Sequence, residues 1–212
     1  MAYVLGFFAA DGYITVNKRG GQFWCIQITD KRLLESIKKI IRAEHRIGIR
    51  PGKENEKTLY RLQIGSIEMC NDLRKIGFFE RKTKNLAVPY VPPKYFFHFV
   101  RGYFDGDGNV WMGLTNKKRQ RPTMTVVTMF TSCSLEFLKQ LHEAFRIFGV
   151  TGGSIYLSKG NYSRLQFSTL DSLKLYDFMY NQCDHREVFP FLKRKRKVFE
   201  KYLVYRKNAA VV

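Results

Sequence analysis

The chain contains one nine-residue pattern twice. The first copy is Val4-Leu5-Gly6-Phe7-Phe8-Ala9-Ala10-Asp11-Gly12, and the second, 96 residues later, is Val100-Arg101-Gly102-Tyr103-Phe104-Asp105-Gly106-Asp107-Gly108. Each copy is an apolar run with small residues four positions apart, and each ends in Asp-Gly. Because positions i and i+4 share one face of a helix, these small residues predict two helices whose backbones approach closely. Such a pair would bring Asp11 and Asp107 near each other, which suits a site for divalent metal ions.

Both segments resemble the motif of the LAGLIDADG homing endonucleases, in the form that carries two copies in one chain. The repeat extends beyond the motif, since residues 61–64 match residues 164–167 and residues 34–48 match residues 135–149. The offset between the copies increases slowly, as small loop insertions between two copies of one unit would produce. The resemblance therefore covers nearly the whole chain.

The resemblance implies an α+β fold. It consists of two pseudo-symmetric αββαββα units with antiparallel, saddle-shaped sheets, packed through the two motif helices. We expect the first unit at residues 1–80, a linker at 81–94 and the second unit at 95–212. The linker contains three prolines, at positions 89, 92 and 93, which restrict the backbone and suit a stiff connector.

Hydrophobic periodicity and turn residues predict the elements within each unit. In the first half we expect strands at 12–18 and 22–30, a helix at 31–46, a hairpin of 47–50 with 58–65, and a helix from 66 to 77. In the second half we expect helices at 95–106, 134–148, 170–181 and 190–205, strands at 109–115 and 122–131, and a hairpin at 153–169.

Net charge points to a polyanionic partner. The chain has 37 basic and 18 acidic side chains, a formal charge of +19, and nucleic acid is the leading candidate for so large an excess. No apolar run is long enough to span a membrane, and the basic residues are spread over both halves instead of gathering on one amphipathic helix, so we expect no membrane partner. Four scattered cysteines without a CxxC pair favour a reducing, intracellular setting, which the sequence does not resolve among cytoplasm, nucleoid and organelle.

The predicted strands alternate apolar and polar residues, so one sheet face would pack on helices and the other would meet a ligand. An antiparallel ribbon fits the DNA major groove, where Arg pairs with guanine and Gln or Asn with adenine. A merely solvated polar face is the alternative reading. The predicted DNA-contacting residues are Tyr13, Thr15, Asn17, Arg19, Gln27, Arg61 and Gln63 in the first half, and Asn109, Trp111, Thr123, Thr125, Arg164 and Gln166 in the second.

Cleaving a phosphodiester bond requires an activated water and stabilisation of charge on the phosphate, and paired divalent ions supply both. Mg²⁺ (or Mn²⁺) prefers oxygen ligands and takes few from the protein, so Asp11 and Asp107 would suffice as carboxylates. By the resemblance, the backbone carbonyl groups of Ala10 and Gly106 also face the ions. Carbonyl groups at a helix C-terminus carry partial negative charge, which favours cation binding there.

The resemblance also implies a basic residue near each metal, after the last helix of each half. The matching residues are Lys82 and Lys195, which would polarise the attacking water or stabilise charge on the phosphate. Either basic run would alternatively be a plain phosphate contact, and residues 193–197 would alternatively be a localisation-like patch. Asp30 and Ser132 correspond to a further polar position of the pocket.

Two residues depart from the family pattern. Ala9 replaces an acidic residue that Asp105 keeps in the second copy, at a position not usually assigned to metal. Arg101 stands where apolar residues are more common, and we expect it to reach the surface or a phosphate.

Taken together, the sequence predicts a monomeric, site-specific, metal-dependent double-strand DNA endonuclease. Its target would be long and asymmetric, and its biological role would be the homing of an intron or intein. Two alternatives stay open: an RNA-binding maturase that assists intron splicing, with intron RNA as partner, and a catalytically silent DNA-binding protein of the same fold. Retention of both motif aspartates favours the nuclease.

Overall fold

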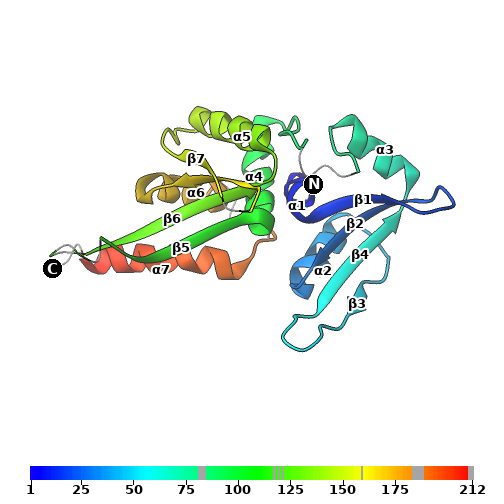
Figure 1. The fold of residues 1–212 in the computed structure, drawn as a ribbon, viewed down its shortest axis with the longest axis horizontal. Coiled ribbons are helices and arrows are strands. Elements are labelled where there is room, and N and C mark those ends of the chain that lie inside the picture. Colours follow the sequence, from blue (N-terminus) through cyan, green and yellow to red (C-terminus); the bar gives the residue numbers. More distant parts are fainter. Residues whose placement is uncertain are drawn as a thin grey trace. The chain divides into compact units, whose positions relative to one another are not determined.

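The computed structural model describes residues 1–80, 85–116, 118, 120, 122–158, 160–182 and 189–209. The chain divides into two units, Met1–Gly106 and Asp107–Val212, and each contains a four-stranded antiparallel sheet with helices on one side (Figure 1). The mixed α+β class and the repeated unit are therefore as predicted. The division differs from the predicted boundary at residue 95 because it assigns nearly all of the second motif helix to the first unit. The boundaries 1–80, 81–94 and 95–212 stay a proposal, and residues 81–84 lie outside the described residues.

The first unit follows the predicted order of elements, and its sheet has the strand order β1-β2-β4-β3. Its elements are α1 (Ala2–Asp11), β1 (Gly12–Val16), β2 (Gln22–Ile28), α2 (Lys31–Ile40), β3 (Gly48–Arg50), β4 (Leu59–Gly65), α3 (Ile67–Lys75) and α4 (Pro93–Asp107).

Alternation along the strands creates the core of the first unit. Ile14, Trp24 and Ile64 are partners in the ladder and all three are buried, as are the leucines of α2 that face the sheet. Phe8 of α1 stacks on Trp24 with the ring centroids 5.5 Å apart, and an edge contact joins Phe8 to Phe78. One face of the sheet is thus covered by helices, and the other is left for the alternate side chains.

Helix α2 is shorter than the predicted helix at 31–46, so that boundary was wrong. The helix ends at Ile40, and Arg42 follows with φ of 52°. Most of the side chains between Arg42 and Gly48 are exposed, so this stretch gains little burial by continuing the helix. It instead leads as a loop into the edge strand β3.

The two motif helices pack directly on one another at their glycines. A Cβ atom added to Gly6 would lie 1.9 Å from the carbonyl oxygen of Phe99, and one added to Gly102 would lie 2.1 Å from the carbonyl oxygen of Tyr3. Both would collide with backbone, which cannot move aside cheaply. The predicted packing through small residues is therefore confirmed at these two glycines.

The second unit repeats the architecture with the strand order β5-β6-β8-β7. Its elements are β5 (Gly108–Thr115), β6 (Thr123–Ser132), α5 (Leu135–Ile147), β7 (Ser154–Leu157), β8 (Ser163–Phe167), α6 (Thr169–Tyr180) and α7 (Lys193–Ala209), with α4 leading into β5.

Helix α7 is an addition to the αββαββα order that α4 to α6 complete. It runs along β5 and contacts α6, and it buries Phe199 and Tyr202 (Figure 1). Phe130, Phe145 and Phe167 form an edge-packed cluster between the sheet and α5. Such aromatic packing adds geometric specificity to the area that it buries.

In the part of the chain that the structure describes, no helix combines the length and apolar character needed to cross a membrane.

Candidate functional site

Asp11 is the last residue of α1, and its half-buried carboxylate stands where the helix turns into β1. The backbone N–H of Gly12 donates to the carbonyl of Phe8, which closes the helix. A Cβ atom at Gly12 would lie 1.9 Å from Cδ2 of Phe8. Only glycine fits after the aspartate, so the Asp-Gly pair is a packing requirement as well as a turn.

Gly106 keeps space beside this carboxylate. A Cβ atom added to Gly106 would lie 2.3 Å from Cβ of Ala10 and 3.1 Å from Oδ2 of Asp11. The donor set at this position consists of a carboxylate and the carbonyl groups of a helix C-terminus, which carry partial negative charge. Hard divalent cations prefer oxygen donors of this kind, so the residues present fit such an ion.

Asp107 ends α4 as Asp11 ends α1, and it is also half-buried. The side chain of Lys195 contacts the residue that follows Asp107: its Nζ donates to the carbonyl oxygen of Gly108 at 2.5 Å. Lys195 is only 5% exposed although it belongs to the basic start of α7. A buried ammonium group needs hydrogen-bond acceptors, and the carbonyl group of Gly108 is one of them. The structure thus brings the predicted Lys195 to the Asp-Gly turn of the second motif.

A polar cluster lies within the pair of motif helices. The phenol of Tyr3 donates to Oδ2 of the buried Asp105 at 2.8 Å, and the Arg101 guanidinium lies over the Tyr3 ring at 5.6 Å. Arg101 is 1% exposed, so the expectation that it reaches the surface or a phosphate was wrong. The guanidinium is stabilised in the interior by two partners. Its Nη2 donates to Nδ1 of His98 at 2.7 Å, and the ring of Tyr3 lies beneath it.

Burial, followed by the Arg101 guanidinium and the N-terminal ammonium group, lowers the pKa of His98 from 6.5 to about 4. His98 is therefore neutral at pH 7, which leaves its Nδ1 free of a proton to accept from Arg101.

The two further polar positions have local roles in the turns that follow the second strands. Oδ1 of Asp30 accepts from the backbone N–H of Leu33 at 2.9 Å and caps α2. The hydroxyl of Ser132, which is buried, accepts from the backbone N–H of Ser134 at 3.1 Å. Both side chains order the start of a helix, and their predicted pocket role stays a prediction.

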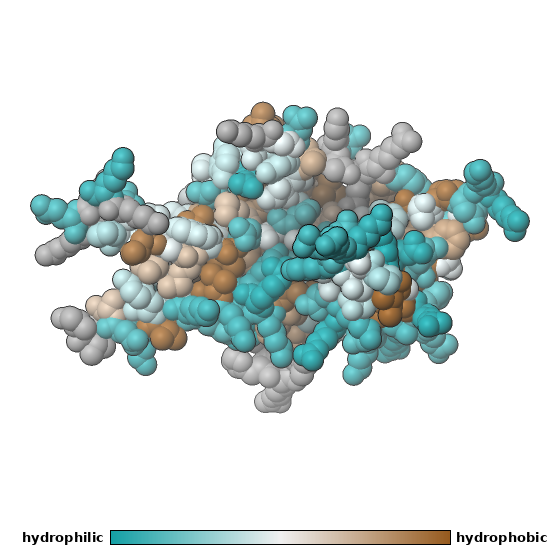
Figure 2. Space-filling model, turned by 60° about the horizontal axis from the view of Figure 1, so that its bottom comes forward, coloured by the Kyte–Doolittle hydropathy of each residue, from teal (hydrophilic) through white to brown (hydrophobic). Residues whose placement is uncertain are grey.

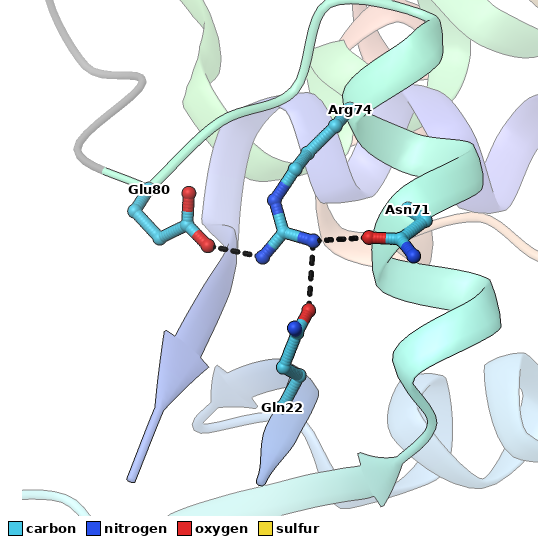
Figure 3. A network of polar contacts seen from close by, with 4 residues as sticks. All are labelled: Gln22, Asn71, Arg74 and Glu80. Carbon is cyan, nitrogen blue, oxygen red and sulfur yellow. Dashed lines mark hydrogen bonds and ion pairs between the residues drawn. The ribbon is translucent and has the colours of Figure 1, made fainter. Parts of the chain in front are cut away.

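Lys82 lies outside the described residues. The chain just before it is anchored by Arg74 of α3, which forms an ion pair with Glu80 (Figure 3). The same guanidinium donates at 2.7 Å to Oε1 of Gln22 and at 2.7 Å to Oδ1 of Asn71. Its hydrogen bond holds the pKa of Glu80 below the ordinary value of 4.5. This network fixes the end of the described segment that leads to Lys82.

The outer face of the first sheet carries most of the predicted base-reading residues. The ladder pairs Tyr13 with Cys25 and Cys25 with Gln63, and the next row pairs Gln27 with Arg61. These side chains share one face because ladder partners point to the same side. Burial and the neighbouring Cys25 raise the pKa of Tyr13 above 10.0, while the Arg61 guanidinium opposes the shift.

A hollow of about 420 Å³ lies on this outer face. It is walled by Arg61 and Gln63 on one side and by His45 and Arg46, from the loop before β3, on the other. Sequence reasoning missed His45 and Arg46 because it placed them inside a helix. The signal that was available is a pair of basic residues, His45 and Arg46, separated only by Ile47 from the edge strand β3.

Asn17 and Arg19 lie beyond β1 in the turn to β2. Oδ1 of Asn17 accepts from the backbone N–H groups of Arg19 at 2.9 Å and Gly21 at 2.8 Å. Asn17 therefore holds the hairpin loop together, in the way that asparagine commonly does in turns. Thr15 stays on β1, opposite Phe23.

On the second sheet the predicted residues again share the outer face. Asn109 pairs with Met129, which pairs with Gln166, and Trp111 pairs with Val127. Trp111 is 43% exposed, a large apolar surface for a side chain that faces away from the core. Thr123 and Thr125 follow on the same face, where their strand pairs with β5.

Two tyrosines that sequence reasoning did not select contact the polar residues of β8. The phenol of Tyr156 donates to Oε1 of Gln166 at 2.9 Å. Nη2 of Arg164 donates to the phenol of Tyr162 at 3.2 Å, and the guanidinium lies 5.3 Å from the centre of that ring. Strand alternation places Tyr156 on the same face as Arg164, so the pattern of β7 held the signal.

Hydrophilic side chains occupy much of the molecular face drawn in Figure 2, with apolar residues scattered between them. This distribution agrees with the excess of basic residues in the sequence. The excess of 37 basic over 18 acidic side chains provides the positive potential that attracts a polyanion.

Similarity to known proteins was found at the level of both sequence family and fold. The structure resembles the LAGLIDADG meganuclease I-AabMI bound to uncleaved DNA, with a TM-score of 0.65 and 16% identity over 99% of this chain and 91% of that one. It also resembles the LAGLIDADG homing endonuclease I-LtrWI bound to target DNA (TM-score 0.61, 14% identity, 96% and 88% covered). I-SmaMI bound to uncleaved DNA in the presence of calcium ions is similar too (TM-score 0.62, 14% identity, 100% and 93% covered).

Among curated protein sequences, none matches this chain. The sequence model described as a LAGLIDADG-like domain matches residues 1–77 and again residues 96–177, which are the two repeats identified above. The chain therefore belongs to the LAGLIDADG-like domain family.

Proposed function

We propose that the protein is a site-specific double-strand DNA endonuclease that acts as a monomer on a long, asymmetric target in the homing of an intron or intein. One observation carries this proposal: each motif helix ends in a half-buried aspartate directly before the first strand of a sheet with a polar outer face. A group suited to metal binding thus stands at the start of each candidate DNA-reading surface.

Double-stranded DNA is the proposed partner. The similar solved structures of I-AabMI, I-LtrWI and I-SmaMI are bound to DNA, and this chain covers most of each. Antiparallel ribbons enter the major groove, and the outer faces hold the Arg, Gln and Asn side chains that pair with purine edges. The charge of +19 supplies the sequence-independent attraction to phosphates.

We propose that Asp11 and Asp107 bind Mg²⁺ (or Mn²⁺), with the backbone carbonyl groups of Ala10 and Gly106 facing the ions. Divalent ions so held would activate water and stabilise charge on the phosphate. The calcium ions present with I-SmaMI agree with a divalent site in a similar fold. The space kept by Gly106 beside the Asp11 carboxylate supports the same assignment.

Lys195 is the positively charged side chain at the Asp107-Gly108 turn of the second motif. Its Nζ holds the carbonyl of Gly108 and thereby fixes the backbone that follows Asp107. We propose that this ammonium also stabilises negative charge on the phosphate beside that turn, and that Lys82 has the same role in the first half. Removing the charge as Lys195→Met would retain the buried stem and lose the contact to Gly108.

The proposal is tested by incubating the protein with a library of long random duplexes and Mg²⁺, then sequencing the broken ends. We expect breaks in both strands at one long sequence whose two halves differ. Enrichment of bound duplexes without any broken ends would instead indicate a silent DNA-binding protein. Selective binding of structured RNA over every duplex would indicate the maturase.

A further inference from the structure

The predicted base-reading residues of the second sheet are not solitary side chains. Tyr156 of β7 is the ladder partner of Arg164, and its phenol reaches along β8 to Gln166 at 2.9 Å. Tyr156 is 39% exposed and Gln166 is partly exposed, so both lie on the accessible outer face. The contact joins the edge strand to a residue that we expect to face a base.

We infer that Tyr156 is a specificity-determining positioning residue that fixes which end of the Gln166 amide faces the DNA, an inference that rests on the proposed function. The phenol donates to Oε1, which turns Oε1 toward Tyr156 and leaves Nε2 directed away from it. A phenol oxygen also accepts hydrogen bonds, but it is a weaker acceptor than an amide oxygen, so this orientation of the amide is favoured over the reversed one. Without the hydroxyl the two orientations of the amide differ little, because both ends have the same shape.

This orientation selects adenine. Bidentate readout of adenine needs Nε2 to donate to N7 while the oxygen accepts from the exocyclic amine. Oε1 has two lone pairs, so it accepts from the adenine while it still accepts from Tyr156. The reversed amide would present its oxygen to N7, itself an acceptor, and would lose both hydrogen bonds. The phenol therefore acts on base identity through Gln166, without touching the base.

Tyr162 and Arg164 offer a matched control on the same face. Tyr162 also contacts a predicted base-reading side chain, through a hydrogen bond at 3.2 Å and a ring contact at 5.3 Å. A guanidinium group carries donors on all sides and no acceptor, so its reversal changes nothing that a base detects. Tyr162→Phe should therefore weaken binding slightly without changing the preferred base.

The test compares the wild-type chain with Tyr156→Phe, Gln166→Ala, the double variant and Tyr162→Phe. Affinity is measured for the selected duplex and for every single-base variant of it, with thermal unfolding followed in parallel. We expect Tyr156→Phe to reduce the preference for adenine about 2- to 10-fold, the range of one net hydrogen bond. The loss should fall only at the position that Gln166→Ala relaxes, and Tyr156→Phe should add nothing in the Gln166→Ala background.

An unchanged base profile for Tyr156→Phe would overturn the inference, as would a uniform loss at all positions with lowered thermal stability. The order parameter of the Gln166 side-chain amide, measured by NMR in the free protein, gives a second test that needs no DNA. It should fall in Tyr156→Phe and stay unchanged in Tyr162→Phe, and equal values in wild type and Tyr156→Phe would also overturn the inference. Failure of the wild-type chain to bind any duplex would refute the proposed function but leave this readout intact.

Discussion

The two motif helices have the same pattern but unequal chemistry. At the offset of 96 residues, α4 carries three polar side chains where α1 carries Ala2, Leu5 and Ala9: these are His98, Arg101 and Asp105. In the structure Tyr3 of α1 meets this set by donating to Asp105. The glycines that control the approach of the helices are kept in both copies, whereas His98, Arg101 and Asp105 come from α4 alone. Helix packing is therefore the shared property, and the environment of the two helix ends is not.

The two sheets teach the same lesson. Their strand orders correspond, and both bury their inward residues against helices. On its outer face, the first sheet places Tyr13, Cys25 and Arg61 on three neighbouring strands, β1, β2 and β4. In the second sheet, Tyr156 and Tyr162 form hydrogen bonds with the polar residues Gln166 and Arg164 of β8. Inward residues are constrained by packing, but outward residues change without loss of the fold. Two unlike outer faces suit two unlike half-sites.

The largest expected effect is that of salt concentration on DNA affinity, and it depends on the excess of positive charge. With about 6–10 phosphate contacts, DNA affinity should fall about 10³–10⁵-fold between roughly 50 and 200 mM salt, because bound counterions are released. Titration of a labelled duplex at several salt concentrations measures the slope. A flat response would show that the excess charge does not bind phosphates, and would break the comparison of two DNA-reading halves.

The shared packing is probed by Gly102→Ala. Its Cβ atom would lie 2.1 Å from the carbonyl oxygen of Tyr3 and 2.8 Å from the backbone nitrogen of Phe7, so α1 and α4 must separate. We expect the free energy of unfolding to fall by at least about 2 kcal/mol in chemical denaturation. Gly48→Ala is the control, since its nearest contact would be at an ordinary 3.7 Å. Equal stability of the two variants would contradict close helix packing.

The difference between the sheets is sharpened by Arg61→Ala and Arg164→Ala. If each arginine pairs with a guanine, each variant should lose about 1–3 kcal/mol of discrimination on one side of the cut only. Affinities for a panel of single-base variants of the target give the result, with Arg32→Ala on the exposed face of α2 as control. A uniform loss across all sequences would reassign the arginine to a phosphate.

The smallest expected effect concerns His98, one of the polar residues that α4 has and α1 lacks. Because the pKa of His98 is lowered to about 4, protonation favours the unfolded chain. The stability that neutral His98 contributes is present above about pH 6.5 and is lost as the pH falls towards 4. Allowing for partial exposure, we expect about 1–2 kcal/mol more acid destabilisation in wild type than in His98→Asn. Unfolding by denaturant at pH 7 and pH 4.5 measures it, and parallel pH dependence would argue against the lowered pKa.

The repeat made the fold predictable, because the spacing of the glycines indicates close helix packing and the alternation of apolar and polar residues indicates which face of each strand is buried. The end of α2 was not predictable in the same way. Residues 43–46 suit a helix locally, and only their lack of burial in the folded chain makes a loop the better state.

Contacts between side chains from distant parts of the chain also could not be predicted from the sequence. The sequence shows Arg101 as a charge on an apolar helix, but not the ring of Tyr3 that receives it. It shows Lys195 in a basic run, but not its hydrogen bond to Gly108 across 87 residues. For Asn17, by contrast, the turn signal was present in the following glycines, and the residue was assigned to a base only because the strand was drawn too long.

The central claim is that each unit contributes one metal-binding carboxylate to double-strand cleavage. Its most direct test is single-turnover cleavage of the selected duplex, with both strands labelled, by wild type, Asp11→Asn and Asp107→Asn, and by Asp72→Asn on the exposed face of α3 as control. Either motif variant should lose more than about 100-fold in double-strand cleavage, since even an outer partner of a metal ligand is worth about 10–100-fold. Both should bind the duplex as wild type does. Cleavage of both strands at near wild-type rates by either motif variant would contradict the account.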